Sequence, residues 1–135
     1  MQRRIPMLVE GFTRDIPYYM ELADFFIGKP GPGSISEALA KRLPVIVQRN
    51  AWTLAQERYN ADWIEELGVG LVVRSFPAEI FDRVRMLLAP ENYHRFRERA
   101  QRMSNFAVYE IPDLLESILS NSPATRHARE EFVTG

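Results

Sequence analysis

The chain repeats one pattern, in which a short apolar run is followed by a segment whose apolar side chains have helical spacing. Three such runs lie at residues 25–28, 44–47 and 70–73. The run at 44–47 has the apolar, β-branched character of a strand that is covered on both faces. Strands that alternate with helices at this spacing form right-handed strand–helix–strand units. The sequence therefore predicts an α/β fold with a parallel sheet and flanking helices.

The same periodicity predicts the remaining elements. A further strand is expected at residues 6–9, and a helix follows it with Ile16, Tyr19, Met20 and Ala23 at helical spacing. A helix is expected at 34–43, and a loop at about 48–55. The next helix has the stripe Tyr59, Trp63, Ile64 and Leu67 and ends at Gly68. The later helices are expected from Pro77 with Ile80, Phe81, Val84 and Leu88, at 91–104 with Tyr93, Phe96, Ala100 and Met103 inward, and from Pro112 with Leu114, Leu115, Ile118 and Leu119. We assign residues 1–120 to one domain and the polar residues 121–135 to a tail.

Composition excludes several classes of protein. Seventeen basic and eighteen acidic residues give a net charge of -1, whereas nucleic-acid binders usually show a basic excess. Cysteine is absent, which excludes disulfides and thiolate metal sites, and the histidines His94 and His127 are too distant in sequence to suggest a histidine-rich metal site. No apolar run approaches the ~20 residues of a membrane-spanning helix. We therefore expect a cytoplasmic protein.

The loop of residues 28–34 joins a predicted strand to a predicted helix and contains three glycines. Glycine lets a backbone approach a ligand closely and adopt a positive φ, and the N-terminus of the next helix favours an anion such as phosphate. The spacing matches neither a P-loop nor the dinucleotide-binding fingerprint. The loop also fits a tight turn in which Ser34 and Glu37 form a capping box. Glu37 thus has two competing roles, as a cap and as a ligand contact.

Two other loops contain side chains suited to binding. Gln56 and Glu57 lie at the start of a helix, where they either hydrogen-bond sugar hydroxyls or only favour the helix dipole. Phe12 follows the first predicted strand, where it either shields a base ring or packs in the core. Parallel sheets bind ligands beyond the carboxyl ends of their strands, so we expect these loops to form one site.

Taken in order, these segments resemble the C-terminal, donor-binding domain of GT-B glycosyltransferases. They are most similar to monogalactosyldiacylglycerol synthases and bacterial diacylglycerol glucosyltransferases, with MurG as a more distant relative. The resemblance is carried by residues 9–13, 23–24, 29–39, 43–47, 56–60 and 68–70. It implies a Rossmann-like parallel sheet with flanking helices, forming part of the C-terminal domain of a GT-B fold.

The resemblance implies a UDP-sugar site. Phe12-Thr13 match the segment that holds the uracil, Gly31-Pro32-Gly33-Ser34 match the turn whose amides bind the diphosphate, and Glu37 matches the acid that binds the ribose. Gln56-Glu57 match the pair that hydrogen-bonds the donor sugar, and Asn60 matches a recurrent polar position of that helix. Neither a metal nor another cofactor is implied, because helix N-termini and amides stabilise the leaving diphosphate.

The chain departs from the family pattern in two ways. Leu54-Ala55 replace a proline-glycine pair, and residues 49–53 differ, with Trp52 either lining a sugar or acceptor pocket or packing on the fold. From the resemblance we expect this chain to lack the N-terminal domain, with the acceptor site and the usual catalytic base, and the first two strand–helix units of the C-terminal domain. We therefore assign no catalytic residue, read His94 as a surface residue and expect this chain alone to be inactive. The strand at 6–9 would lack its usual neighbour, which suggests strand-mediated self-association.

The sequence thus predicts the UDP-sugar-binding half of a glycosyltransferase that transfers a hexose to a lipid such as diacylglycerol. The alternative is a non-catalytic nucleotide-binding subunit of a two-chain glycosyltransferase. A sugar-nucleotide epimerase fits less well, because Lys29-Pro30 stand where such enzymes usually have a histidine. The full-length protein is expected to be peripheral at a membrane. The arginines of residues 91–104 either contact anionic lipid or form a solvated helix face.

Overall fold

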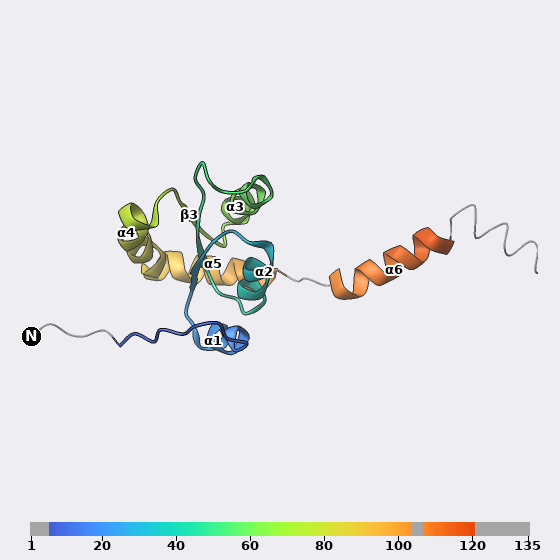
Figure 1. The fold of residues 1–135 in the computed structure, drawn as a ribbon, viewed down its shortest axis with the longest axis horizontal. Coiled ribbons are helices and arrows are strands. Elements are labelled where there is room, and N and C mark those ends of the chain that lie inside the picture. Colours follow the sequence, from blue (N-terminus) through green and yellow to red (C-terminus); the bar gives the residue numbers. More distant parts are fainter. Residues whose placement is uncertain (1–5, 104–106, 121–135) are drawn as a thin grey trace, which may run out of the picture. The chain divides into compact units, whose positions relative to one another are not determined.

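The computed structural model describes residues 6–103 and 107–120, which belong to two compact units (Figure 1). The second unit contains the helix α6 (Ala107–Ser120). The first unit, up to Met103, contains in chain order α1 (Ile16–Leu22), β1 (Phe26–Gly28), α2 (Pro32–Ala40), β2 (Val45–Gln48), α3 (Ala55–Leu67), β3 (Gly70–Val73), α4 (Phe76–Leu88) and α5 (Pro90–Arg102).

The three described strands form one parallel sheet in the order β1-β2-β3. Val45 of β2 is the common point of the register, since it pairs with Phe26 of β1 and with Gly70 of β3. Each crossover contains a helix, as parallel neighbours require. The predicted α/β class, with a parallel sheet and flanking helices, is confirmed.

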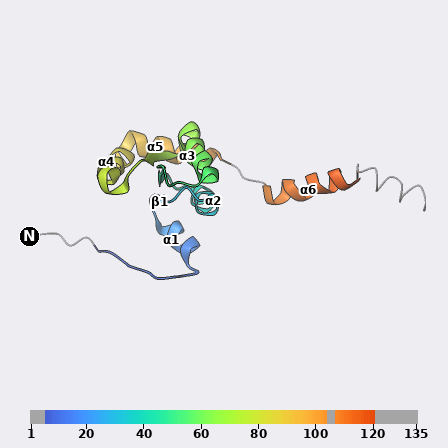
Figure 2. The same ribbon diagram turned by 45° about the horizontal axis from the view of Figure 1, so that its top comes forward.

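Alternate side chains of the sheet enter two separate apolar clusters. Val45 and Val47 of β2 pack in one cluster with residues of α2 and α3, whereas Ile46 packs in the other with Val73 and with Leu87 of α4. Figures 1 and 2 both show α4 on one side of the sheet and α2 and α3 on the other. Because both faces are covered, the central strand is entirely apolar up to Gln48 and shows no polar alternation.

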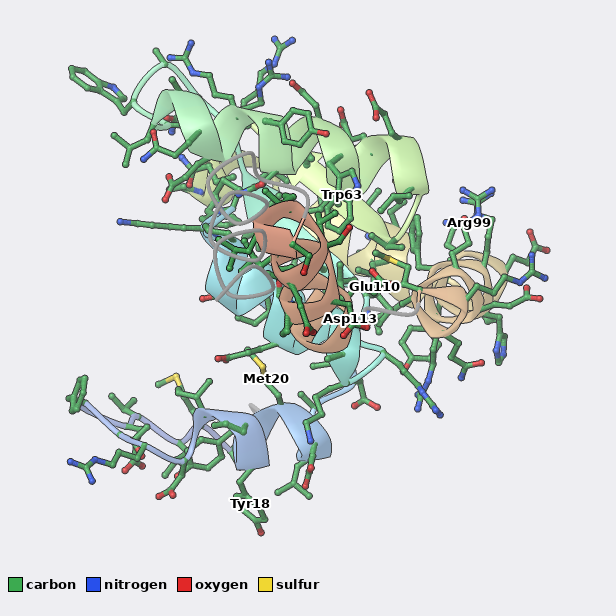
Figure 3. All side chains as sticks on the ribbon, turned by 90° about the vertical axis from the view of Figure 1, so that its right-hand side faces the viewer. Tyr18, Met20, Trp63, Arg99, Glu110 and Asp113 are labelled. Carbon is green, nitrogen blue, oxygen red and sulfur yellow. The ribbon has the colours of Figure 1, made fainter. Side chains whose placement is uncertain are left out.

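Two further helices complete the packing of this unit. Met20 of α1 is buried in the first cluster, and Figure 3 shows it directed towards α2 while Tyr18 points away. Helix α5 serves both clusters, with Ala100 in the first and Phe96 in the second. Coverage is incomplete at the edge strand, where Ile27 of β1 is 41% exposed although it pairs with the fully buried Ile46.

The predicted strand at residues 6–9 is wrong. These residues belong to no strand, and the side chains of Met7, Leu8 and Val9 are at least 72% exposed. The run has strand-like composition, but within the described residues β1 pairs only with β2, so no strand lies against residues 6–9. The predicted self-association therefore lacks the strand on which it was based.

The predicted helix faces are right only in part. Tyr59, Phe81 and Leu88 were expected inside but are 71%, 73% and 48% exposed, while Ala61 and Leu87 are fully buried. In both helices other positions face the sheet, because the way a helix packs on a sheet depends on tertiary contacts. The apolar positions predicted for the last helix are also exposed, by 54–65%: Leu114, Leu115, Ile118 and Leu119. The inward positions predicted for α5 are confirmed, and His94 is exposed as expected.

Helix ends are set by glycine and proline. Gly68 ends α3 in the left-handed conformation (φ 61°) and donates its N–H to the carbonyl of Glu65, as expected of a C-terminal glycine. Helix α2 begins two residues earlier than predicted, because Pro32 suits the first turn. Pro112 lies inside α6 and does not begin it. Within the described residues, no helix has the length and apolar character needed to cross a bilayer.

Candidate functional site

A small cleft lies beyond the carboxyl ends of β1 and β2. It has a volume of about 280 Å³, and both the loop after β1 and the loop after β2 contribute to it. Its lining comprises Lys29, Pro30, Gln48, Asn50, Trp52, Thr53, Leu54 and Glu57. The cleft therefore lies where parallel sheets bind ligands, between two of the three loops that the sequence indicated.

The glycine turn beside this cleft is more open than the fold requires. Gly31 has φ −70° and ψ 136°, and within the described residues Gly68 is the only glycine with a positive φ, so the glycine turn does not use this freedom of glycine. A Cβ atom added at Gly31 or Gly33 would meet no atom within 4 Å. Neither backbone conformation nor crowding therefore requires glycine at positions 31 and 33. The effect of these two glycines is to leave the backbone accessible to a ligand.

The N-terminus of α2 has hydrogen-bond donors without side-chain caps. Gly31 is the N-cap residue, and Ser34 lies inside the helix, so the structure does not contain the capping box with Glu37 that was the alternative role of this loop. The first N–H groups of a helix have no partner within it, and here Pro32 supplies none. The amides of Gly33 and Ser34 therefore point out of an exposed helix end, an arrangement that favours an anion.

Asn60 connects the two loops physically. Its Nδ2 donates a 2.9 Å hydrogen bond to the carbonyl oxygen of Pro30, so α3 holds the glycine turn in place. The Asn60 side chain is half-buried. This contact gives Asn60 a positioning role, whereas a direct contact with a donor sugar stays a prediction.

The predicted acids differ in their surroundings. Glu37 is exposed on α2, and its carboxylate makes no hydrogen bond or ion pair with any described residue, so this carboxylate is available to a ligand. Glu57 is half-buried and lines the cleft, whereas Gln56 is exposed and does not line it. Of this predicted pair, the structure brings only Glu57 to the cleft.

Phe12 and Thr13 lie outside the cleft. Phe12 is fully exposed, which rules out the core packing that was its alternative role. Thr13 Oγ1 accepts the N–H of Asp15 at 3.1 Å in the bend before α1. Because residues 6–9 form no strand, nothing among the described residues fixes this segment beside the glycine turn.

The loop after β2 adds Asn50 and Thr53 to the cleft, two residues that the sequence did not single out. Asn50 Oδ1 accepts the N–H of Trp52 at 3.0 Å, and Thr53 Oγ1 accepts the N–H of Asn50 at 2.9 Å, which shapes a compact turn. The turn leaves Trp52 91% exposed at the cleft, so it does not pack in the core. Lys29 and Gln48 also line the cleft, and the signal for both was their position at the end of a strand.

Glu79 stabilises the loop after β3. Its Oε1 accepts the N–H groups of Arg74 and Ser75 at 2.9 and 3.0 Å, and these two bonds, aided by Arg83, hold the pKa of the Glu79 carboxyl below its ordinary value of 4.5. A lowered carboxyl pKa contributes stability above the unfolded-state pKa and loses it as the pH falls through the folded-state pKa.

We therefore expect Glu79→Gln to lower the melting temperature at neutral pH and to have less effect in acid. The difference between wild type and variant should begin to shrink near pH 4.5 and continue to shrink at lower pH. Thermal unfolding followed by circular dichroism over this range measures it. A difference that is independent of pH would show that the carboxylate charge contributes nothing.

Sequence comparison finds similar proteins but no matching protein-family model. The chain is 36% identical over 88 residues to "Monogalactosyldiacylglycerol synthase, chloroplastic" of Spinacia oleracea. The matched region covers 65% of this chain and 16% of the spinach protein. It is 38% identical over 72 residues to monogalactosyldiacylglycerol synthase 2 of Arabidopsis thaliana, covering 53% and 15%. A probable monogalactosyldiacylglycerol synthase of Glycine max is 32% identical over 123 residues, covering 88% and 23%.

These matches confirm the resemblance to monogalactosyldiacylglycerol synthases that the motifs indicated. The chain spans less than a quarter of the length of each of these relatives.

Proposed function

We propose that this chain is the UDP-sugar-binding part of a GT-B glycosyltransferase that transfers a hexose to a lipid acceptor such as diacylglycerol. The observation that carries the proposal is the open turn at the carboxyl end of β1, where neither conformation nor packing requires a glycine at position 31 or 33. The similarity to monogalactosyldiacylglycerol synthases supports the class of reaction and of acceptor. The binding part lies within residues 1–120.

Each part of the donor has a chemically suitable partner. The free amides at the start of α2 suit the diphosphate, because a helix N-terminus offers both donors and partial positive charge. The unpaired Glu37 carboxylate, on the same helix, can accept hydrogen bonds from both ribose hydroxyls. Glu57 in the cleft can do the same for the sugar. Phe12 and Thr13 would close over the uracil.

The chemistry itself requires a catalytic base, and we assign that role to none of the residues at 6–103 and 107–120. An inverting transfer needs a base near the acceptor hydroxyl, and we propose that the base and most of the acceptor site belong to an N-terminal domain. The role of the present residues is then to hold the donor and to stabilise the charge of the leaving diphosphate. With a lipid acceptor, the complete enzyme would work at a membrane surface.

A titration with UDP, with ADP as control, tests this proposal through amide NMR shifts. Shifts are expected at Gly31 to Glu37 and around Glu57, with UDP bound more tightly than ADP. Gly33→Ala is the decisive variant, because an alanine fits the helix and should stabilise it by about 0.5–1 kcal/mol. Its methyl group would nevertheless occupy the space through which a phosphate reaches the backbone, so UDP affinity should fall at least about tenfold.

Gly33→Ala is thus expected to raise stability and to lower UDP affinity. These opposite changes distinguish a turn that binds a ligand from a turn that only supports the fold. A folded Gly33→Ala variant that binds UDP as tightly as the wild type would contradict the proposed turn. Equal binding of ADP and UDP would retain a diphosphate site but overturn the uracil preference.

A further inference from the structure

A second and larger cleft is lined by the loops after β2 and β3 and by residues of α3, β3 and α4. It has a volume of about 1160 Å³, and none of its lining residues comes from the glycine turn or from α2. It shares only Asn50 with the small cleft. Its charged lining residues are Arg49, Arg58, Arg74 and Arg83 and the acids Glu65 and Glu79. Four arginines thus come together from two loops and two helices of a chain whose net charge is -1.

Two of these arginines have carboxylate partners and two do not. Arg49 forms an ion pair with Asp62, and Arg83 forms one with Glu79 at 3.4 Å. Within residues 6–103 and 107–120, no carboxylate lies within 4 Å of the guanidinium of Arg58 or Arg74. The cleft therefore contains two positive charges that no described carboxylate pairs directly.

Arg58 is held in position without losing its capacity to bind. Its Nε donates to the carbonyl of Thr53 and one terminal nitrogen donates to the carbonyl of Ala51, both at 3.0 Å. A guanidinium has five N–H donors, so three remain. The same two bonds tie the loop after β2 to α3, which fixes the guanidinium relative to the cleft wall.

Arg74 has an anchored backbone and an uncommitted side chain. Its N–H is bound by Glu79 Oε1 at 2.9 Å, while its guanidinium makes no hydrogen bond with any other described residue. The Glu79 carboxylate occupies the backbone donors at this helix start, so an external anion would be bound by side chains rather than by amides.

We propose that this cleft binds a phosphate group, with Arg58 and Arg74 as its principal contacts. The planar guanidinium fork matches phosphate oxygens with two parallel N–H···O bonds, which makes arginine suitable for phosphate. Two unpaired guanidinium groups balance the charge of a phosphate monoester, and of two neighbouring phosphodiesters. The phosphate can belong to a free phosphate compound or to a phospholipid headgroup, because both present the same oxygens.

The test uses two phosphate sources and a matched pair of variants of the full chain. Inorganic phosphate is titrated while the arginine Nε–H resonances are followed by NMR, and flotation measures binding to phosphatidylcholine vesicles with and without phosphatidylglycerol. Arg74→Gln removes one cleft arginine. Arg85→Gln is the control, because Arg85 lies on α4 over the exposed ring of Phe81 and does not line the cleft.

Binding of either source that falls about fivefold in Arg74→Gln and is unchanged in Arg85→Gln supports the proposal. A response to inorganic phosphate identifies a site for free phosphate compounds, and binding only to vesicles with phosphatidylglycerol identifies a headgroup site. Equal loss in both variants, or binding to neither source, would overturn it. Saturating UDP should leave the phosphate shifts intact. If UDP abolished them, the cleft would belong to the donor site and would not be separate.

Discussion

Replacing Glu37 with glutamine is expected to weaken UDP binding by about 10- to 150-fold and to leave the stability of the fold unchanged. Hydrogen bonds to a charged group contribute roughly 1.5–3 kcal/mol, and each 1.4 kcal/mol is about a factor of ten in affinity. Stability should not change, because the Glu37 carboxylate caps no helix and pairs with no described residue. Isothermal calorimetry with UDP and urea unfolding measure the two quantities.

Glu66→Gln is the matched control for this prediction. Glu66 is an exposed acid on α3 that lines neither cleft, so its replacement removes the same charge from the chain without touching the proposed site. UDP affinity should be the same as in the wild type. If Glu37→Gln and Glu66→Gln had equal affinity for UDP, the ribose role of Glu37 would be wrong.

Replacing Gly70 with alanine is expected to destabilise the first unit by about 3 kcal/mol, at the upper end of the cost of overpacking a core. An added Cβ would lie 2.0 Å from the carbonyl oxygen of Val45, a backbone atom of the neighbouring strand. Relief would require β2 and β3 to separate at the point where Val45 and Gly70 pair. Urea unfolding should show a lower midpoint, and circular dichroism at zero urea should show whether the variant still folds.

Gly11→Ala tests whether the cost comes from crowding or from the loss of a glycine as such. A Cβ at Gly11 meets nothing within 4 Å, and the residue has no positive φ. Its replacement should therefore change stability by less than about 0.5 kcal/mol. Equal destabilisation by the two substitutions would contradict the close contact between the strands.

The elements that the sequence predicted well are those with a local cause. Periodicity located all three described strands and the helices between them, and Gly68 ends α3 as predicted because its left-handed conformation is intrinsically accessible to glycine. The failures have a tertiary cause. Residues 6–9 have the composition of a strand, but a strand also needs a neighbour. Tyr59 and Phe81 have helical spacing, but the packing of each helix chose Ala61 and Leu87 instead.

The candidate site likewise has features that the sequence could predict and features that it could not. The parallel direction of the strands follows from the alternation of the sequence, so the sequence could place the glycine turn and Glu57 at one edge of a sheet. It could not show that Asn60 is bonded to Pro30, because that contact joins residues 30 positions apart. Nor could it show that Gln56 points away from the cleft, since a single step around a helix changes the direction of a side chain by about 100°.

The sequence by itself determined the α/β class, the parallel sheet and the resemblance to monogalactosyldiacylglycerol synthases, because apolar periodicity and short motifs are properties of neighbouring residues. The tertiary structure decided that the glycines at 31 and 33 stand in open space, that Glu37 is free of any cap, and that four arginines from separate segments meet in one cleft. These three features depend on how distant segments pack against the same sheet edge. No local pattern encodes the space that such packing leaves open.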